Sequence, residues 1–159
     1  MKRRSELRLY NVLFPIWFFF FFPTVLWGLI LPANFLIDSA VLLLAAKRLG
    51  LAKPERIQLW KKSILPVWLI GFFSDAVGGL FIFALTLLWE RLDLPGNLYL
   101  FPGTTLISVP GVVLAGLLIY RLDRWVLRRR GQNAAAAHRL ALAMAVFTAP
   151  YAMLIPLYG

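Results

Sequence analysis

Long stretches without a charged residue are the feature that most constrains how this chain can fold. Residues 9–37 run for 29 positions without a charge, residues 94–120 for 27, and residues 140–159 for 20. A further stretch, residues 63–89, contains a single acid, Asp75. A helix needs about 20 apolar residues to cross a bilayer, because each residue advances it by about 1.5 Å. The pattern therefore predicts an all-α integral membrane protein.

The composition supports this class and leaves no room for a separate soluble domain. Hydrophobic residues make up 61% of the 159 residues, and the mean hydropathy is +0.77. Such values are too apolar for a soluble domain of this length, so residues 1–159 are expected to form one transmembrane domain. The chain has no cysteine, which excludes disulfides and thiolate metal sites, and no pattern in it predicts a metal or a cofactor.

Threading the apolar stretches through a bilayer predicts a compact bundle of five crossings. These cover about residues 10–31, 33–49, 63–89, 104–120 and 140–157, with basic loops at 50–62 and 121–139. Residues 31–34 are expected to form a tight reversal in which Asn34 caps the second helix. A short amphipathic helix is expected on the membrane surface within 50–62, and the fourth helix is expected to continue past the membrane and stop at Gly131.

The positions of the lysines and arginines predict which side of the membrane each connection faces. With the N-terminus in the cytoplasm and the C-terminus outside, 16 of the 17 lysines and arginines fall on the cytoplasmic side, and only Arg91 lies outside. Such a bias in short loops is typical of the cytoplasmic face, so a multi-pass protein of a bacterial plasma membrane is expected. The net charge of +10 is interpreted as contact with anionic lipid headgroups rather than with nucleic acid. The candidate lipid contacts are Lys53, Arg56, Lys61, Lys62, Arg128, Arg129 and Arg130.

Two acids stand inside the predicted crossings, Asp38 and Asp75. An ionised carboxylate in hydrocarbon costs at least about 2.5–3.5 kcal/mol on insertion scales, and no lysine, arginine or histidine lies in the predicted membrane core to pair with them. The helical rise places Asp38 roughly 7 Å and Asp75 roughly 12 Å below the outer boundary. The two acids thus come at similar depths on sequential, antiparallel helices and can face each other. The alternative for Asp38 is a backbone hydrogen bond near the headgroups, and for Asp75 a protonated acid that joins two helices.

Other polar side chains fall in the same half of the bilayer and complete a predicted proton, cation or ligand pocket. With Asp38 and Asp75 they are Asn34, Ser39, Ser74, Ser108, Thr148 and Tyr151. Small residues such as Gly71, Gly78 and Gly111 are expected to let helices approach closely around the pocket.

Two functions follow from this arrangement. In the first, the chain is a homo-oligomeric transporter or channel for a proton, a small cation or a cationic solute, in which two close carboxylates share a proton or hold a cation. In the second, it is a non-enzymatic accessory, anchor or assembly subunit, and a cation of a membrane-protein partner pairs with the acids. We expect the first.

An enzyme is the least favoured class. The arrangement of two intramembrane aspartates at one level is similar to that of aspartyl intramembrane proteases, which implies an acid–base pair that activates water. Those proteases carry a Gly-x-Gly-Asp element, whereas this chain has Gly71-Phe-Phe-Ser-Asp75. The sequence also lacks Gly-x-Ser-x-Gly and His-Glu-x-x-His elements, so no catalytic residue is expected.

Overall fold

The computed structural model describes residues 27–95 and 101–155, and every regular element in these two ranges is helical. The elements are α1 (Trp27–Arg48), α2 (Lys53–Arg91), α3 (Gly103–Arg129), α4 (Ala134–Phe147) and the short 3-10 helix η2 (Tyr151–Leu154). Four segments within this part of the chain are long and apolar enough to cross a membrane: α1, α2, α3 and the stretch from α4 through η2. The structure is that expected of a multi-pass membrane protein.

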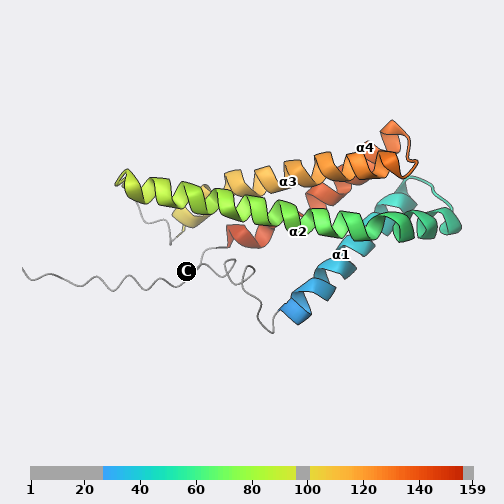
Figure 1. The fold of residues 1–159 in the computed structure, drawn as a ribbon, viewed down its shortest axis with the longest axis horizontal. Coiled ribbons are helices and arrows are strands. Elements are labelled where there is room, and N and C mark those ends of the chain that lie inside the picture. Colours follow the sequence, from blue (N-terminus) through green and yellow to red (C-terminus); the bar gives the residue numbers. More distant parts are fainter. Residues whose placement is uncertain (1–26, 96–100, 156–159) are drawn as a thin grey trace, which may run out of the picture.

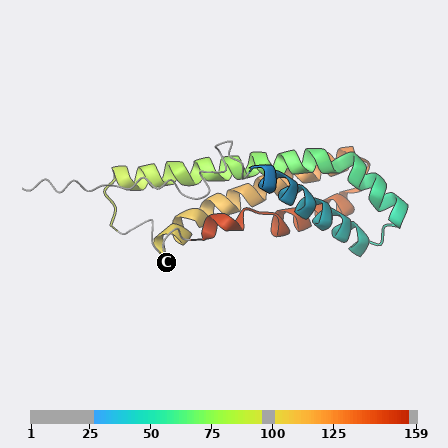
Figure 2. The same ribbon diagram turned by 90° about the horizontal axis from the view of Figure 1, so that it is seen from below.

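The helices pack as a bundle in which successive elements run in opposite directions (Figure 1). The long helices α2 and α3 lie side by side, α4 returns along α3, and α1 crosses the bundle at an incline (Figures 1 and 2). α1 packs on both α2 and α4, and η2 packs on α3. The C-terminal end of α1, the N-terminal end of α2 and the α3–α4 connection therefore meet at one end of the bundle.

That end holds almost all of the positive charge, and we call it the basic end. Of the 13 lysines and arginines in the described residues, 12 lie at or near the α1–α2 and α3–α4 connections, and Arg91 lies at the opposite end of α2. The sequence predicted this segregation. It follows from the fold itself, since the connections that carry the cations are brought to one side.

The predicted reversal at residues 31–34 is wrong. α1 begins at Trp27 and continues without a break through Pro32, so Asn34 lies inside the helix and does not cap it. Pro32 stands near the start of α1, where its missing N–H removes only one early hydrogen bond. The predicted first crossing, 10–31, lies mostly outside the described residues. Both the count of five crossings and the orientation of the termini stay predictions.

The predicted surface helix and third crossing are one element. α2 runs for 39 residues from Lys53 to Arg91, which is about 58 Å at the helical rise and well beyond a 30 Å hydrocarbon core. Its basic first turns therefore extend past the apolar part. Figure 2 shows α2 bending toward its N-terminal end, the region that contains Pro66, as expected where proline removes a helical hydrogen bond.

The last crossing, predicted at 140–157, begins earlier than predicted, at Ala134, and is broken after Phe147. α4 begins at Ala134, where the Asn133 side chain accepts a hydrogen bond from the Ala136 N–H at 2.8 Å, and it ends at Phe147. Pro150 disfavours a helical conformation at the residue before it, and the chain resumes only as the single turn of η2. Residues 156–159 lie outside the described part.

Glycines end two of the helices where the sequence turns. Gly131 follows α3 with φ +91°, as predicted, and Gly50 follows α1 with φ +79°. At each turn the next residue donates back to a carbonyl inside the helix, Gln132 to Leu127 and Leu51 to Ala46. This hydrogen-bond pattern is the Schellman motif. It fixes the two connections that shape the basic end.

Tight packing joins α2 to α3 in the middle of the bundle. A Cβ atom added at Gly78 would lie 2.8 Å from the Gly111 carbonyl oxygen, so a side chain at either glycine has no room. The main apolar core lies to the basic side of this contact, around Leu42, Val67 and Ile119. A smaller cluster around Ile82 and Met153 lies toward the other end.

Candidate functional site

The two predicted acids come from neighbouring helices, α1 and α2, and lie near each other. Asp38 is 6% exposed, and Asp75 is half-buried with Oδ1 shielded and without a hydrogen-bond partner. The Asp38 carboxyl is within electrostatic range of Asp75. One Asp38 oxygen lies 3.7 Å from the point where a Cβ would stand at Gly71, so this glycine lets the carboxyl approach the α2 backbone.

A third acid, Asp123 of α3, is buried on another helix of the same bundle. Its side chain is 1% exposed, and neither carboxyl oxygen has a hydrogen-bond partner in the structure. Asp38 lies within electrostatic range of Asp123 as well as of Asp75. We call Asp38, Asp75 and Asp123 the carboxyl site. Each of its members comes from a different helix, and within the described residues none forms an ion pair.

Reasoning from the sequence missed Asp123, because Arg121 and Arg124 flank it and place it in a predicted cytoplasmic extension. A signal was nevertheless present. Starting from Gly111 and Ala115, steps of four residues lead to Ile119, Asp123 and Leu127, and the structure buries all five. Residues four apart share a helix face, so extending the small-residue face by this period would have placed Asp123 inside.

Three of the five predicted hydroxyl residues, Ser39, Ser74 and Ser108, are buried on α1, α2 and α3. The Oγ atoms of Ser39, Ser74 and Ser108 have no hydrogen-bond partner in the structure, and the unpredicted Ser63 of α2 shares this property. Buried hydroxyls normally find a partner in the protein or in water. Ser39 and Ser74 directly neighbour Asp38 and Asp75 in sequence, and Asn34 stands one turn before Asp38 on α1, half-buried. The carboxyl site is thus accompanied by spare polar groups.

The remaining two predicted residues serve the break after α4. Thr148 donates to the Met144 carbonyl at 2.8 Å, and the Tyr151 hydroxyl donates to the Val146 carbonyl at 2.7 Å. Backbone carbonyls freed at a helix end need partners in an apolar environment. The structure therefore gives Thr148 and Tyr151 a local role at the helix end rather than a contact with the acids.

The chemistry open to the carboxyl site is limited to what carboxyl and hydroxyl oxygens provide. No group of three or more histidine, aspartate or glutamate side chains in the described ranges is arranged to hold a metal ion. Carboxyl groups held near one another without cations can share a proton or stabilise a positive charge between them. The site therefore fits a proton, a monovalent cation or an organic cation.

The seven predicted lipid contacts all belong to the basic end, on α2 and at the end of α3. One of them is held by an aromatic ring, because the Arg129 guanidinium stacks 4.2 Å from the centre of the Trp125 ring. His138, the single histidine, is also engaged there. Its Nδ1 lies 2.8 Å from the Tyr120 hydroxyl, which accepts a hydrogen bond from Arg124 at 3.1 Å.

Comparison with known proteins gives no relative from which to transfer a function. No protein-family model, no curated protein and no solved structure matches this chain.

Proposed function

We propose that this chain is a membrane transporter or channel for a proton, a small cation or a cationic solute. The observation that carries the proposal is the carboxyl site: Asp38, Asp75 and Asp123, on three helices, are buried or half-buried in one bundle, and within the described residues no cation pairs with them. Burying even one such group is costly unless it is paired. A sequence that keeps three is best explained when a transported proton or cation uses them.

The three acids differ in position in a way that suits a path. Asp123 lies on the part of α3 nearer the basic end, Asp75 lies beyond Asp38 toward the other end, and Asp38 is within electrostatic range of both. We infer that Asp38 links the other two. A proton or cation would then move along the bundle axis in short steps rather than cross in one.

We further propose that the basic end faces the cytoplasm of a bacterial plasma membrane, because cations in short connections favour that side. The small size of the bundle makes a homo-oligomer the working unit in this proposal. The proposal assigns no enzymatic step to the site.

The test is ion flux into proteoliposomes that contain the purified full-length chain, followed with an internal pH-sensitive dye and with cation-selective dyes. Asp75→Asn and Asp123→Asn are each expected to reduce flux by at least about tenfold, because an amide neither carries a proton nor holds a cation. Asp93→Asn is the matched control. Asp93 is exposed in the turn after α2 with φ +49°, a conformation that asparagine tolerates, and its flux should equal that of the wild type. Wild-type flux in both buried variants would contradict the proposal.

A second function, an accessory subunit of a larger membrane complex, is favoured by the same lack of counter-charge. A cation from a partner helix would neutralise the carboxyl site as well as a transported ion does. Native mass spectrometry of the protein extracted gently from its membrane separates the two. A homo-oligomer supports transport, whereas a stoichiometric foreign subunit that is lost in Asp123→Asn supports the accessory role.

A further inference from the structure

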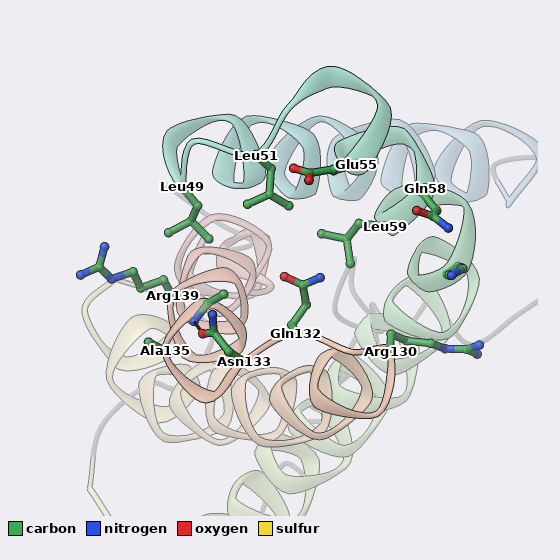
Figure 3. Close-up of a pocket in the computed structure, with 12 residues that line it drawn as sticks. Leu49, Leu51, Glu55, Gln58, Leu59, Arg130, Gln132, Asn133, Ala135 and Arg139 are labelled. Carbon is green, nitrogen blue, oxygen red and sulfur yellow. Dashed lines mark hydrogen bonds between the residues drawn. The ribbon is translucent and has the colours of Figure 1, made fainter.

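The basic end forms an open cavity of about 590 Å³ that shares no residue with the carboxyl site. Its walls come from the α1–α2 connection, the first turns of α2, the α3–α4 connection and the start of α4 (Figure 3). The two connections are the ones fixed by the Schellman turns at Gly50 and Gly131. The cavity is therefore a product of the fold and not of one loop.

The lining of the cavity has an excess of positive charge. Lys62, Arg130 and Arg139 line it, and Glu55 is the one acid among the lining residues. The Glu55 carboxylate is already engaged, because it accepts a hydrogen bond from the Ala52 N–H at 2.9 Å. Within the part of the chain that the structure describes, none of the three cations forms an ion pair. An anion bound in the cavity would form ion pairs with these three cations.

Neutral donors complete the lining. Figure 3 shows the Gln132 side chain in the centre of the cavity, with Arg130 and Arg139 on opposite sides of its rim. The backbone of Gln132 is held by its hydrogen bond to Leu127 at 3.1 Å, whereas its side-chain amide has no partner among the described residues. In Figure 3 the guanidinium groups of Arg130 and Arg139 extend outward from the rim, and both side chains are exposed and free to turn toward the pocket.

The volume of the cavity and the arrangement of its cationic side chains limit which class of anion can bind there. A phosphate group presents several acceptor oxygens in different directions, which suits separate cationic side chains, and arginine binds it in bidentate fashion. A cavity of this volume falls within the range of small-molecule sites and is larger than inorganic phosphate alone requires. Leu49, Leu51 and Leu59 supply an apolar part of the wall, which would face the organic part of the ligand.

We propose that this cavity binds the phosphate group of an organic phosphate ester. The same chemistry is offered by the headgroup of an anionic phospholipid and by a soluble phosphate ester. The ends of the apolar helices bring the basic end to the headgroup region, and the cavity mouth is also open to the aqueous phase. The proposal does not depend on the transport role.

The test uses the purified full-length chain and two probes. Native mass spectrometry measures retention of phosphatidylglycerol against zwitterionic phosphatidylcholine, and calorimetric titration measures the Kd for glycerol 3-phosphate. We expect one of the two phosphate probes to bind and the double variant Arg130→Gln/Arg139→Gln to weaken that binding by at least about tenfold, as expected for lost charge-assisted hydrogen bonds. Retention of phosphatidylglycerol identifies a lipid site, and binding of glycerol 3-phosphate identifies a soluble ligand.

Two further variants keep the test specific. Lys47→Gln/Arg48→Gln removes the same number of charges from exposed positions of the basic end that do not line the cavity, and binding should change by less than about twofold. Gln132→Leu leaves every charge in place and should still weaken binding several-fold. The proposal is overturned if neither phosphate probe binds, if the two charge variants weaken binding equally, or if Gln132→Leu binds as the wild type does. Helical circular dichroism confirms that each variant is folded.

Discussion

The carboxyl site and the basic end place opposite charges in opposite environments. The acids of the interior are few and largely shielded, and in the described residues no cation pairs with them, whereas the cations of the basic end are numerous and mostly exposed. Some of these cations also have partners, as in the stacking of Arg129 on Trp125 and the hydrogen bond of Arg124 to Tyr120. A charge in water costs little and a buried one costs much. The comparison teaches that the number of charges says less about function than their depth does.

The largest effect is expected from removing a buried acid. Asp123→Leu replaces an almost fully buried carboxyl group, which has no hydrogen-bond partner, with an apolar side chain of similar size. We expect the free energy of unfolding to rise by about 1–3 kcal/mol, because an unsatisfied polar group is removed, while ion flux is lost. Thermal unfolding in detergent, followed by tryptophan fluorescence, measures the first effect. A large fall in stability would show that the interior acid is a structural element, and the contrast with the basic end would then be lost.

An effect on stability of similar size, but without a direct loss of ion flux, is expected from the packing that holds the interior together. Gly78→Ala adds a methyl group 2.8 Å from the Gly111 carbonyl oxygen, and such overpacking costs about 1–3 kcal/mol. Gly28→Ala is the matched control, since a Cβ at this helical position meets no atom within 4 Å. There the higher helix propensity of alanine should stabilise by up to about 1 kcal/mol. Equal shifts of the two unfolding temperatures would contradict the close α2–α3 contact.

The smallest effect is expected at the basic end. Arg48→Gln/Lys61→Gln removes two charges from exposed helix positions, and substitutions of this kind usually change stability by less than about 0.5 kcal/mol. The same unfolding assay, at low and at high salt, measures the change. A loss as large as that of Gly78→Ala would mean that the cations stabilise the fold, and the two regions would no longer differ in the way described above.

Two prolines show that the sequence alone did not predict whether a helix continues or breaks. Pro32 and Pro150 both interrupt apolar stretches, yet α1 continues through Pro32 while the last segment breaks before Pro150. Pro32 is close to a helix start and removes one early hydrogen bond. At Pro150 the Tyr151 hydroxyl binds the Val146 carbonyl, which lacks a helical partner because proline has no N–H, and the Thr148 hydroxyl adds a second hydrogen bond to the Met144 carbonyl. The sequence marks both sites, but it does not say which helix end finds such partners.

The buried acids also show which features could be predicted from the sequence and which could not. Depth along a helix follows from counting residues, because the rise per residue is constant, and this count predicted similar depths for Asp38 and Asp75. Rotation about the helix axis decides which residues are buried, and it depends on what packs against the helix. Asp123 was assigned to water for this reason, although its spacing of four from Ile119 and Leu127 places it on their face.

The sequence by itself determined the helical class, the membrane-length apolar segments and the gathering of cations in the connections, because these depend on local composition and on the fixed rise of a helix. The tertiary structure alone decided that acids from three helices are buried in one bundle, that Gly78 and Gly111 touch, and that two connections line one basic pocket. These features require contacts between residues far apart in the chain. Such contacts depend on helix rotation and crossing, which the packing of whole side-chain surfaces sets and no short segment encodes.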